Sequence, residues 1–152
     1  MFKIKNNTLL KKIIFAVIIL ILFGAGIIWY IFNEKFTDTT EVKSNFSINA
    51  LDLIKEFSQN DSLSNKKYAE KILVVTGMVS QIEAADSTVN IKMSDTTSGS
   101  YVIFAFQQQH TKDAKTLNVG DKVSIKGSCS GGAYSQILET EFITFKRCAI
   151  NK

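Results

Sequence analysis

The sequence IIFAVIILILFGAGIIWYIF runs from Ile13 to Phe32 and divides the chain into parts. It holds 20 residues, none of them charged, and it contains no Pro, Asn or Gln. An α-helix rises about 1.5 Å per residue, so this stretch would be about 30 Å long, the thickness of a bilayer's hydrocarbon core. A lone segment in lipid must satisfy its own backbone hydrogen bonds, which a helix does. We therefore predict a single transmembrane helix over residues 13–32.

This apolar stretch separates three other parts of the 152-residue chain. Residues 1–12 form a short Lys-rich tail, and residues 33–46 are polar, mixed in charge and rich in Thr. We interpret residues 33–46 as a linker. Residues 47–152 are long enough for one small domain with a modest hydrophobic core.

The charges beside the apolar stretch predict its orientation. The tail carries four lysines, Lys3, Lys5, Lys11 and Lys12. No comparable cluster follows Phe32, where Glu34 and Lys35 cancel. Positively charged flanks stay on the cytoplasmic side of a membrane. We expect a single-pass protein of the inner (cytoplasmic) membrane, with its N-terminus in the cytoplasm and its domain on the extracytoplasmic, periplasmic side.

A cleaved secretory signal is the alternative interpretation of the same stretch. Residues 13–23 would form its apolar region, and Gly24-Ala25-Gly26 would offer small residues for cleavage. The apolar run nevertheless continues through residues 27–32, which a signal peptide does not need. We favour the retained anchor, and either interpretation exports the domain.

The net charge of +4 comes entirely from the tail. From Asn33 onward the chain has 14 Lys and Arg against 14 Asp and Glu, so the domain is formally neutral. Proteins that hold nucleic acid through its phosphates need a cationic surface. The domain lacks this global signature, although small clusters such as Lys66-Lys67 and Lys146-Arg147 remain.

A helical pattern opens the domain. Ser47 is a candidate N-cap, and an apolar stripe follows at spacing i, i+3, i+4, i+7, formed by Ala50, Leu53, Ile54 and Phe57. We expect this helix to pack on a domain core. The polar residues 59–67 predict a turn and a short helix.

From Lys71 the pattern changes to alternation with period 2, which is typical of strands. The predicted strands cover residues 71–82, with a bend or bulge at Gly77, then 87–94, 101–106, 122–129 and 136–146. Residues 107–118 are expected to form a short helix or loop, and Ser130 to Ala133 a hairpin turn. Five strands with a connector between the third and fourth predict a mainly β protein, the five-stranded OB-fold barrel.

Short motifs in these elements resemble the tRNA-anticodon-like (tRNA_anti-like) family. They are Ser47 with Ala50, Leu53 and Phe57, then Asn65-Lys66-Lys67-Tyr68 with Lys71, Val75-Thr76-Gly77-x-Val79, and Gly120-Asp121-x-Val123-x-Ile125-x-Gly127. The resemblance spans about residues 47–145. It implies a small bacterial OB-fold protein of the kind found behind a membrane anchor or lipoprotein signal. It implies no activity and supplies no catalytic residue.

OB-folds usually bind ligands on the outer face of their second and third strands. If Val89, Ile91 and Met93 point inward, the outward residues of these strands are Asn90, Lys92, Ser94, Tyr101 and Ile103. This set has a single aromatic ring and a single cation, whereas binders of single strands usually combine several rings with a basic groove. We treat these five residues as a candidate ligand-binding face, against the alternative of an ordinary solvated barrel wall.

No motif for catalysis or metal binding holds up against its structural requirements. Gly127-Ser128-Cys129-Ser130-Gly131 imitates a nucleophile elbow, but an elbow needs a strand-turn-helix and a later His, and His110 lies upstream. Ser64-Asn65-Lys66-Lys67 imitates S-x-x-K without its companion motifs. The lone His110 is better explained as an exposed loop residue than as a metal ligand. We expect no enzymatic activity, no metal and no cofactor.

Two cysteines, Cys129 and Cys148, would invite a disulfide in an exported domain. With a hairpin turn at residues 130–133, Cys148 would lie about 11 residues beyond the position that faces Cys129. That separation is about 36 Å along straight strands, far beyond disulfide reach. We expect unpaired thiols.

These observations predict a membrane-anchored extracytoplasmic OB-fold module that binds a protein or an envelope component. The alternative is a nucleic-acid-binding OB domain related to anticodon-binding domains, which the charge and the expected location disfavour. The dependence of binding on salt concentration distinguishes the two functions, because nucleic-acid binding weakens steeply as ionic strength rises.

Overall fold

A computed structural model describes residues 7–32 and 37–152, and the chain divides after Phe36 into two compact units. The first unit contains one helix, α1 (Asn7–Phe32), which begins within the predicted Lys-rich tail. Its part from Lys11 to Phe32 is long and apolar enough to span a membrane, and its side chains are exposed. The predicted span 13–32 lies inside this helix. A signal sequence near the N-terminus can meet the same criteria of length and composition, so the helix alone does not distinguish the two interpretations.

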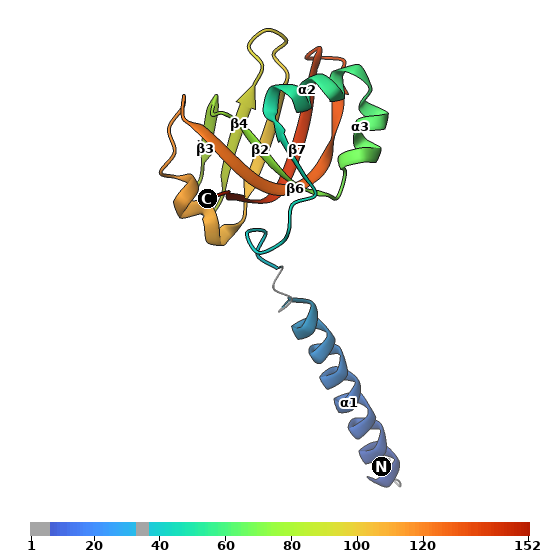
Figure 1. The fold of residues 1–152 in the computed structure, drawn as a ribbon. Coiled ribbons are helices and arrows are strands. Elements are labelled where there is room, and N and C mark those ends of the chain that lie inside the picture. Colours follow the sequence, from blue (N-terminus) through green and yellow to red (C-terminus); the bar gives the residue numbers. More distant parts are fainter. Residues whose placement is uncertain (1–6, 33–36) are drawn as a thin grey trace. The chain divides into compact units, whose positions relative to one another are not determined.

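The second unit begins at Thr37 and contains seven strands (Figure 1). Its elements in chain order are β1 (Phe46–Asn49), α2 (Ala50–Gln59), α3 (Asp61–Tyr68), β2 (Ile72–Met78), β3 (Gln81–Ala84), β4 (Val89–Ser94), β5 (Tyr101–Phe106), the 3₁₀ turn η1 (Gln108–His110), α4 (Thr111–Ala114), β6 (Lys122–Ser135) and β7 (Thr140–Ile150). The predicted mainly β fold and the helical connector between the third and fourth long strands are confirmed.

The strands form one sheet in the order β1-β2-β6-β7-β5-β4-β3. Its ladder is not closed, yet β2 and β3 are separated only by Val79 and Ser80. The Val79 N–H donates to the Asp121 carbonyl before β6, and the Ser80 N–H donates to the Lys92 carbonyl in β4. The chain therefore passes from the second strand of this order to the last within two residues. The predicted first strand of the barrel is real, but it is divided into β2 and β3.

Gly77 lets neighbouring side chains pack closely against β2, and it does not form the predicted bend. A Cβ atom there would lie 2.7 Å from the Met93 sulfur and 2.9 Å from the Ala50 Cβ. Real Cβ contacts are longer, so only glycine lets the start of α2 and the side chain of Met93 pack this closely on the strand.

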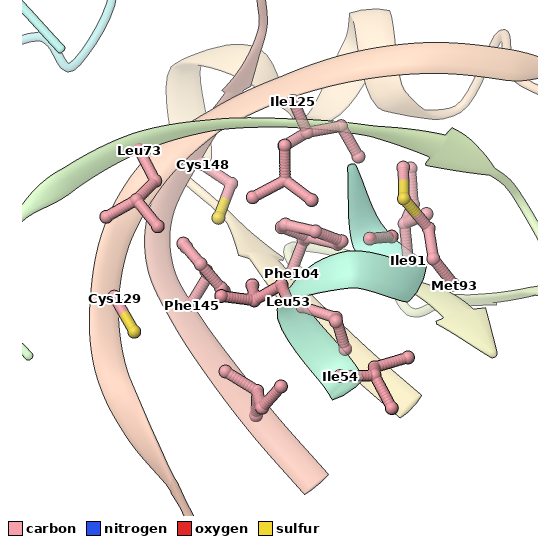
Figure 2. Close-up of a cluster of buried hydrophobic side chains, with 14 of the residues drawn as sticks. Leu53, Ile54, Leu73, Ile91, Met93, Phe104, Ile125, Cys129, Phe145 and Cys148 are labelled. Atoms are coloured by element: carbon pink, nitrogen blue, oxygen red, sulfur yellow. The ribbon is translucent and has the colours of Figure 1, made fainter. Parts of the chain in front are cut away.

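Helix α2 places its apolar stripe in the core of the domain (Figure 2). All four predicted stripe residues are buried, and Leu53 has no exposed surface. The predicted N-cap was wrong, because Ser47 lies in β1. Asn49 caps the helix, its side-chain oxygen accepting a hydrogen bond from the Leu51 N–H at 2.9 Å.

The hairpin turn predicted at residues 130–133 was also wrong. Strand β6 continues through Gly131 and Gly132 to Ser135, and the hairpin turns between Ser135 and Thr140. The two glycines permit contact with the helices instead. A Cβ on Gly132 would lie 2.6 Å from the Phe57 ring, and Asn65 of α3 bonds both the N–H and the carbonyl of Gly132.

This longer β6 changes the relation between the cysteines. Cys129 pairs with Phe145, so Cys148 lies three residues along the neighbouring strand, and the expected separation of 11 residues was wrong. Both thiols are nonetheless free and buried, at separate places in the core (Figure 2). Burial raises the pKa of Cys129 to about 11 and that of Cys148 well above its ordinary value.

The described part of the predicted linker packs on the domain. Residues 33–36 lie outside the described residues, but from Thr37 the chain belongs to the second unit. Thr39 is buried, and the Lys126 ammonium donates to the Thr40 carbonyl at 3.0 Å. Asp38 contacts His110, which is half-buried rather than an exposed loop residue. The folded unit thus begins about ten residues before the predicted domain boundary at residue 47.

Candidate binding face

The five predicted face residues lie on the outer side of β4 and β5. They alternate with the buried residues of the same strands, and each of the five is half-buried. The antiparallel register pairs Lys92 with Ile103 and Ser94 with Tyr101, while Asn90 faces Ala105. The structure thus brings the predicted residues together on one surface. Their role in binding stays a prediction.

Lys92, the cation of this face, has two neighbours that weaken its attraction for an anion. Its ammonium lies 2.8 Å from a Glu83 carboxylate oxygen on β3. It also lies 5.3 Å from the centre of the Tyr101 ring, within range of a cation–π contact. A phosphate that approached Lys92 would compete with a carboxylate already in place.

An aromatic pair occupies the other end of the face. The rings of Tyr101 and Phe142 are stacked, with centroids 6.3 Å apart and planes at 24°. The parallel register of β5 and β7 places these two residues opposite each other. Sequence analysis missed Phe142 because the predicted last strand slipped in its alternation. Reading outward from the buried Ile143 and Phe145 would have placed Phe142 on the solvent side.

Three loops near these strands each carry one acidic and no basic residue, although Lys115, from the segment after β5, donates to the Asp86 carbonyl at 3.4 Å. They are residues 85–88 with Asp86, residues 95–100 with Asp95, and residues 136–139 with Glu139. The Thr97 N–H and the Ser98 hydroxyl bond Asp95, and these bonds lower the pKa of its carboxyl group. The face therefore combines partly exposed ring surface with a border in which acidic side chains predominate. It can stack or cover apolar and planar groups, and it offers little to a polyanion.

A mostly apolar pocket of about 370 Å³ adjoins the face at Ser94. It lies where β2 and β4 diverge beside the first turn of α2, and its lining includes Ala50, Leu51, Met78 and Met93. Leu51 and Met78 are exposed at its edge. The pocket extends the apolar surface available next to the aromatic pair.

The residues of the two catalytic look-alike motifs are engaged elsewhere. The Ser64 hydroxyl donates to the Glu56 carbonyl, and Lys67 pairs with the Glu56 carboxylate. Cys129 sits within β6, with a thiol whose pKa burial raises to about 11. Across residues 7–32 and 37–152, no group of three or more His, Cys, Asp or Glu residues is placed to hold a metal ion.

Residues 3–141 match the tRNA_anti-like family. The chain belongs to this family. This match confirms the resemblance that we based on motifs such as the Gly120-Asp121 turn and the strand around Gly77. A search of curated proteins gave no significant match.

Solved structures share the fold at low sequence identity. A "putative nucleic acid-binding lipoprotein" from Klebsiella pneumoniae is 17% identical with a TM-score of 0.55, over 69% of this chain and 91% of that one. An "OBody" bound to hen egg-white lysozyme is 22% identical with a TM-score of 0.42, over 57% of this chain and 87% of that one. A "putative aspartyl-tRNA synthetase" from Leishmania major is 10% identical with a TM-score of 0.45, over 76% of this chain and 22% of that one.

Proposed function

We propose that this tRNA_anti-like protein is a membrane-anchored, extracytoplasmic binding module without enzymatic activity. Its partner would be a protein or another component of the cell envelope, held on the face of Asn90, Lys92, Ser94, Tyr101 and Ile103 together with Phe142. The observation that carries the proposal is the stacked pair of Tyr101 and Phe142, set beside a lysine that Glu83 already neutralises.

The chemistry of the face favours a partner with apolar or aromatic side chains. Exposed aromatic rings provide much of the binding energy in protein interfaces, whereas charged pairs at the rim contribute little. The three bordering loops add carboxylates, which would repel phosphates, and Lys115 lies beside only the loop that holds Asp86. A polypeptide that covers the two rings gains apolar contact beside a lysine whose charge Glu83 already pairs.

The anchor and its orientation are supported by the helix and by charge. Helix α1 has an unbroken apolar surface from Ile13 to Phe32, and the lysines lie on its N-terminal side. Reporter fusions after Lys35 and after Lys152 test the topology. We expect an extracytoplasmic reporter to be active at both sites, and retention in the membrane pellet after alkaline carbonate. An active cytoplasmic reporter at either site would contradict the orientation.

Crosslinking in intact membranes tests the binding face. A photoreactive residue in place of Ile103 should capture one defined partner from the full-length chain, and Tyr101→Ala or Phe142→Ala should abolish that product. Leu63→Ala is the matched control, because Leu63 is an exposed apolar residue on α3, away from the face. Capture that survives both aromatic substitutions would place the partner elsewhere on the domain.

Nucleic-acid binding is the second candidate, favoured by the description of the Klebsiella protein. It predicts that a single-stranded oligonucleotide binds the full-length chain and dissociates steeply as salt rises. If the chain binds an oligonucleotide in this way and Tyr101→Ala abolishes the binding, nucleic-acid binding would be the function of the face in place of protein binding. A captured envelope protein that stays bound in high salt would favour the first candidate.

A further inference from the structure

Glu141 is a carboxylate that the domain buries without a partner. It is 2% exposed, and its Oε1 atom has no hydrogen-bond partner among the described residues. Its backbone N–H donates to the Ser100 hydroxyl, so its position at the start of β7 is fixed. Burying an unpaired polar or charged group lowers stability, and such groups are therefore rare unless they have a role.

This carboxylate lines an open pocket of about 370 Å³. The other walls come from three elements: Phe57, Ser58 and Gln59 at the end of α2, Asn60 and Asp61 at the start of α3, and Tyr134 on β6. Figure 1 shows α2 and α3 beside the upper parts of β6 and β7, which brings these segments together. Tyr134 and Glu141 are direct partners across the β6–β7 ladder.

The pocket is negatively charged. Asp61 is a second carboxylate in its wall, and no Lys, Arg or His lines it. The end of α2 and the start of α3 both meet the pocket, so their helix dipoles oppose each other and the carboxylates determine its charge. Burial, and then the charge of Asp61, raises the pKa of Glu141. Tyr134 is the other titratable group in the lining. A positive charge in the pocket would relieve the repulsion between the carboxylates.

We propose that this pocket binds an organic cation, an ammonium or guanidinium group. Such a group donates hydrogen bonds to a carboxylate, and its charge offsets both carboxylates. Tyr134, whose side chain is largely exposed, offers an aromatic wall of the kind that attracts ammonium and guanidinium ions. Ca²⁺ takes six to eight oxygen ligands, and two carboxylates provide a poor match for that number.

The cation could come from a lysine or arginine of a bound polypeptide or from a free small molecule. The pocket is independent of the Tyr101–Phe142 face, so it would persist whichever partner that face binds. Ile137 and Leu138, exposed at the tip of the β6–β7 hairpin, lie next to Tyr134 in the chain and would contact apolar residues beside a bound lysine or arginine.

Saturation-transfer NMR on the full-length chain in uncharged detergent micelles provides the test. The probes are ethylguanidinium and n-butylammonium, with n-butanol as the neutral comparison. We expect transfer to both cations and not to butanol. Glu141→Gln should weaken binding about tenfold or more, because it removes the charge-assisted bond but keeps the shape. Asp61→Asn should weaken binding less. Glu139→Gln, on the exposed tip of the same hairpin, is the matched control and should bind normally.

The pH dependence in the unmodified chain is a test that needs no variant. Binding should strengthen as pH rises through the pKa of Glu141, since only its ionised form attracts a cation. A blocked peptide, acetyl-Ile-Arg-Ile-amide, separates the two sources. Binding at least tenfold tighter than ethylguanidinium assigns the cation to a polypeptide, and equal binding assigns it to a small molecule. Failure of both cations to bind, or equal binding by Glu141→Gln, would overturn the proposal.

Discussion

The Asp38 carboxylate lies 2.8 Å from Nε2 of His110, joining two residues that are 72 positions apart in the chain. Asp38 also accepts hydrogen bonds from the N–H and hydroxyl groups of Thr40. The Thr40 N–H contributes most to lowering the pKa of Asp38 to about 2, and His110 adds to it. The contact holds the segment before β1 against the 3₁₀ turn η1.

Asp38→Asn should therefore reduce the stability of the folded unit. The pKa of this carboxyl group falls from 3.8 when free to about 2 when folded, so its contribution is present above pH 3.8 and is lost as pH falls through about 2. The side chain is partly exposed, so we expect a loss of about 1 kcal/mol near neutral pH. Thermal unfolding of the full chain followed by tyrosine fluorescence measures it, with Asp52→Asn as control. A loss unchanged at pH 2 would contradict this assignment.

Tyr101→Ala and Phe142→Ala should each weaken partner binding about tenfold or more while leaving the fold intact. Central aromatic residues of interfaces often contribute about 2 kcal/mol or more to binding. Both rings lie on the outer side of the sheet, so core packing is preserved. Dissociation constants for the crosslinked partner, once purified, check the prediction. Tyr101→Phe keeps the stacked ring and should bind nearly normally. Equal loss in Tyr101→Phe would assign the effect to the hydroxyl group.

Gly132→Ala should destabilise the domain by about 1–3 kcal/mol, the usual cost of overpacking a core. The added methyl would lie 2.6 Å from one atom of the Phe57 ring and 3.0 Å from Ile143, and Phe57 has little room to move because it is buried. Ser130→Ala is the neighbouring control in the same strand, since Ser130 is exposed. Thermal unfolding compares the two variants. Equal stability would mean that α2 moves freely away from β6.

Cys129 and Cys148 should resist alkylation in the folded chain. With a pKa of about 11 in place of 9, the reactive thiolate of Cys129 at pH 8 is about a hundredfold scarcer, and burial blocks access as well. Iodoacetamide labelling followed by mass spectrometry should modify neither residue until denaturant is added. Rapid labelling without denaturant would reveal local opening of the β6–β7 pair.

The regular parts of the fold could be predicted from local patterns in the sequence. Alternating residues such as Val89, Ile91 and Met93 identified a strand because one face of it is buried, and the helix stripe around Leu53 was clear for the same reason. Strand β1 was missed, because its four residues alternate over too short a stretch to indicate a strand, and they become one by pairing with β2. The hairpin was misplaced because Gly131 and Gly132, which normally indicate a turn, serve close contact with the helices.

The candidate sites could not be fully predicted from the sequence, because they depend on how distant segments pack together. Tyr101 was predicted, but its stacking on Phe142 depends on the parallel register of β5 and β7, which no local pattern encodes. Asp61 and Glu141 are 80 positions apart, and each by itself is an ordinary surface-type residue. Their common pocket exists because α3 packs beside the β6–β7 hairpin. Alternation from Ile143 places Glu141 on the inward face of β7, but no local pattern indicates that its carboxylate would lack a partner there.

The two-residue connection at Val79 and Ser80 makes the barrel mechanically uneven. Neighbouring strands of the sheet are held by ladders of backbone hydrogen bonds, whereas β2 and β4 share no ladder. Ser80 bonds the Lys92 carbonyl of β4 through its N–H and its hydroxyl group and pairs with the Ser94 hydroxyl, and α2 packs on both strands. Expansion of the wall would therefore begin along this line, widening the apolar pocket between Met78 and Met93. A ligand larger than that pocket would enter by separating two strand ends, without breaking any complete ladder.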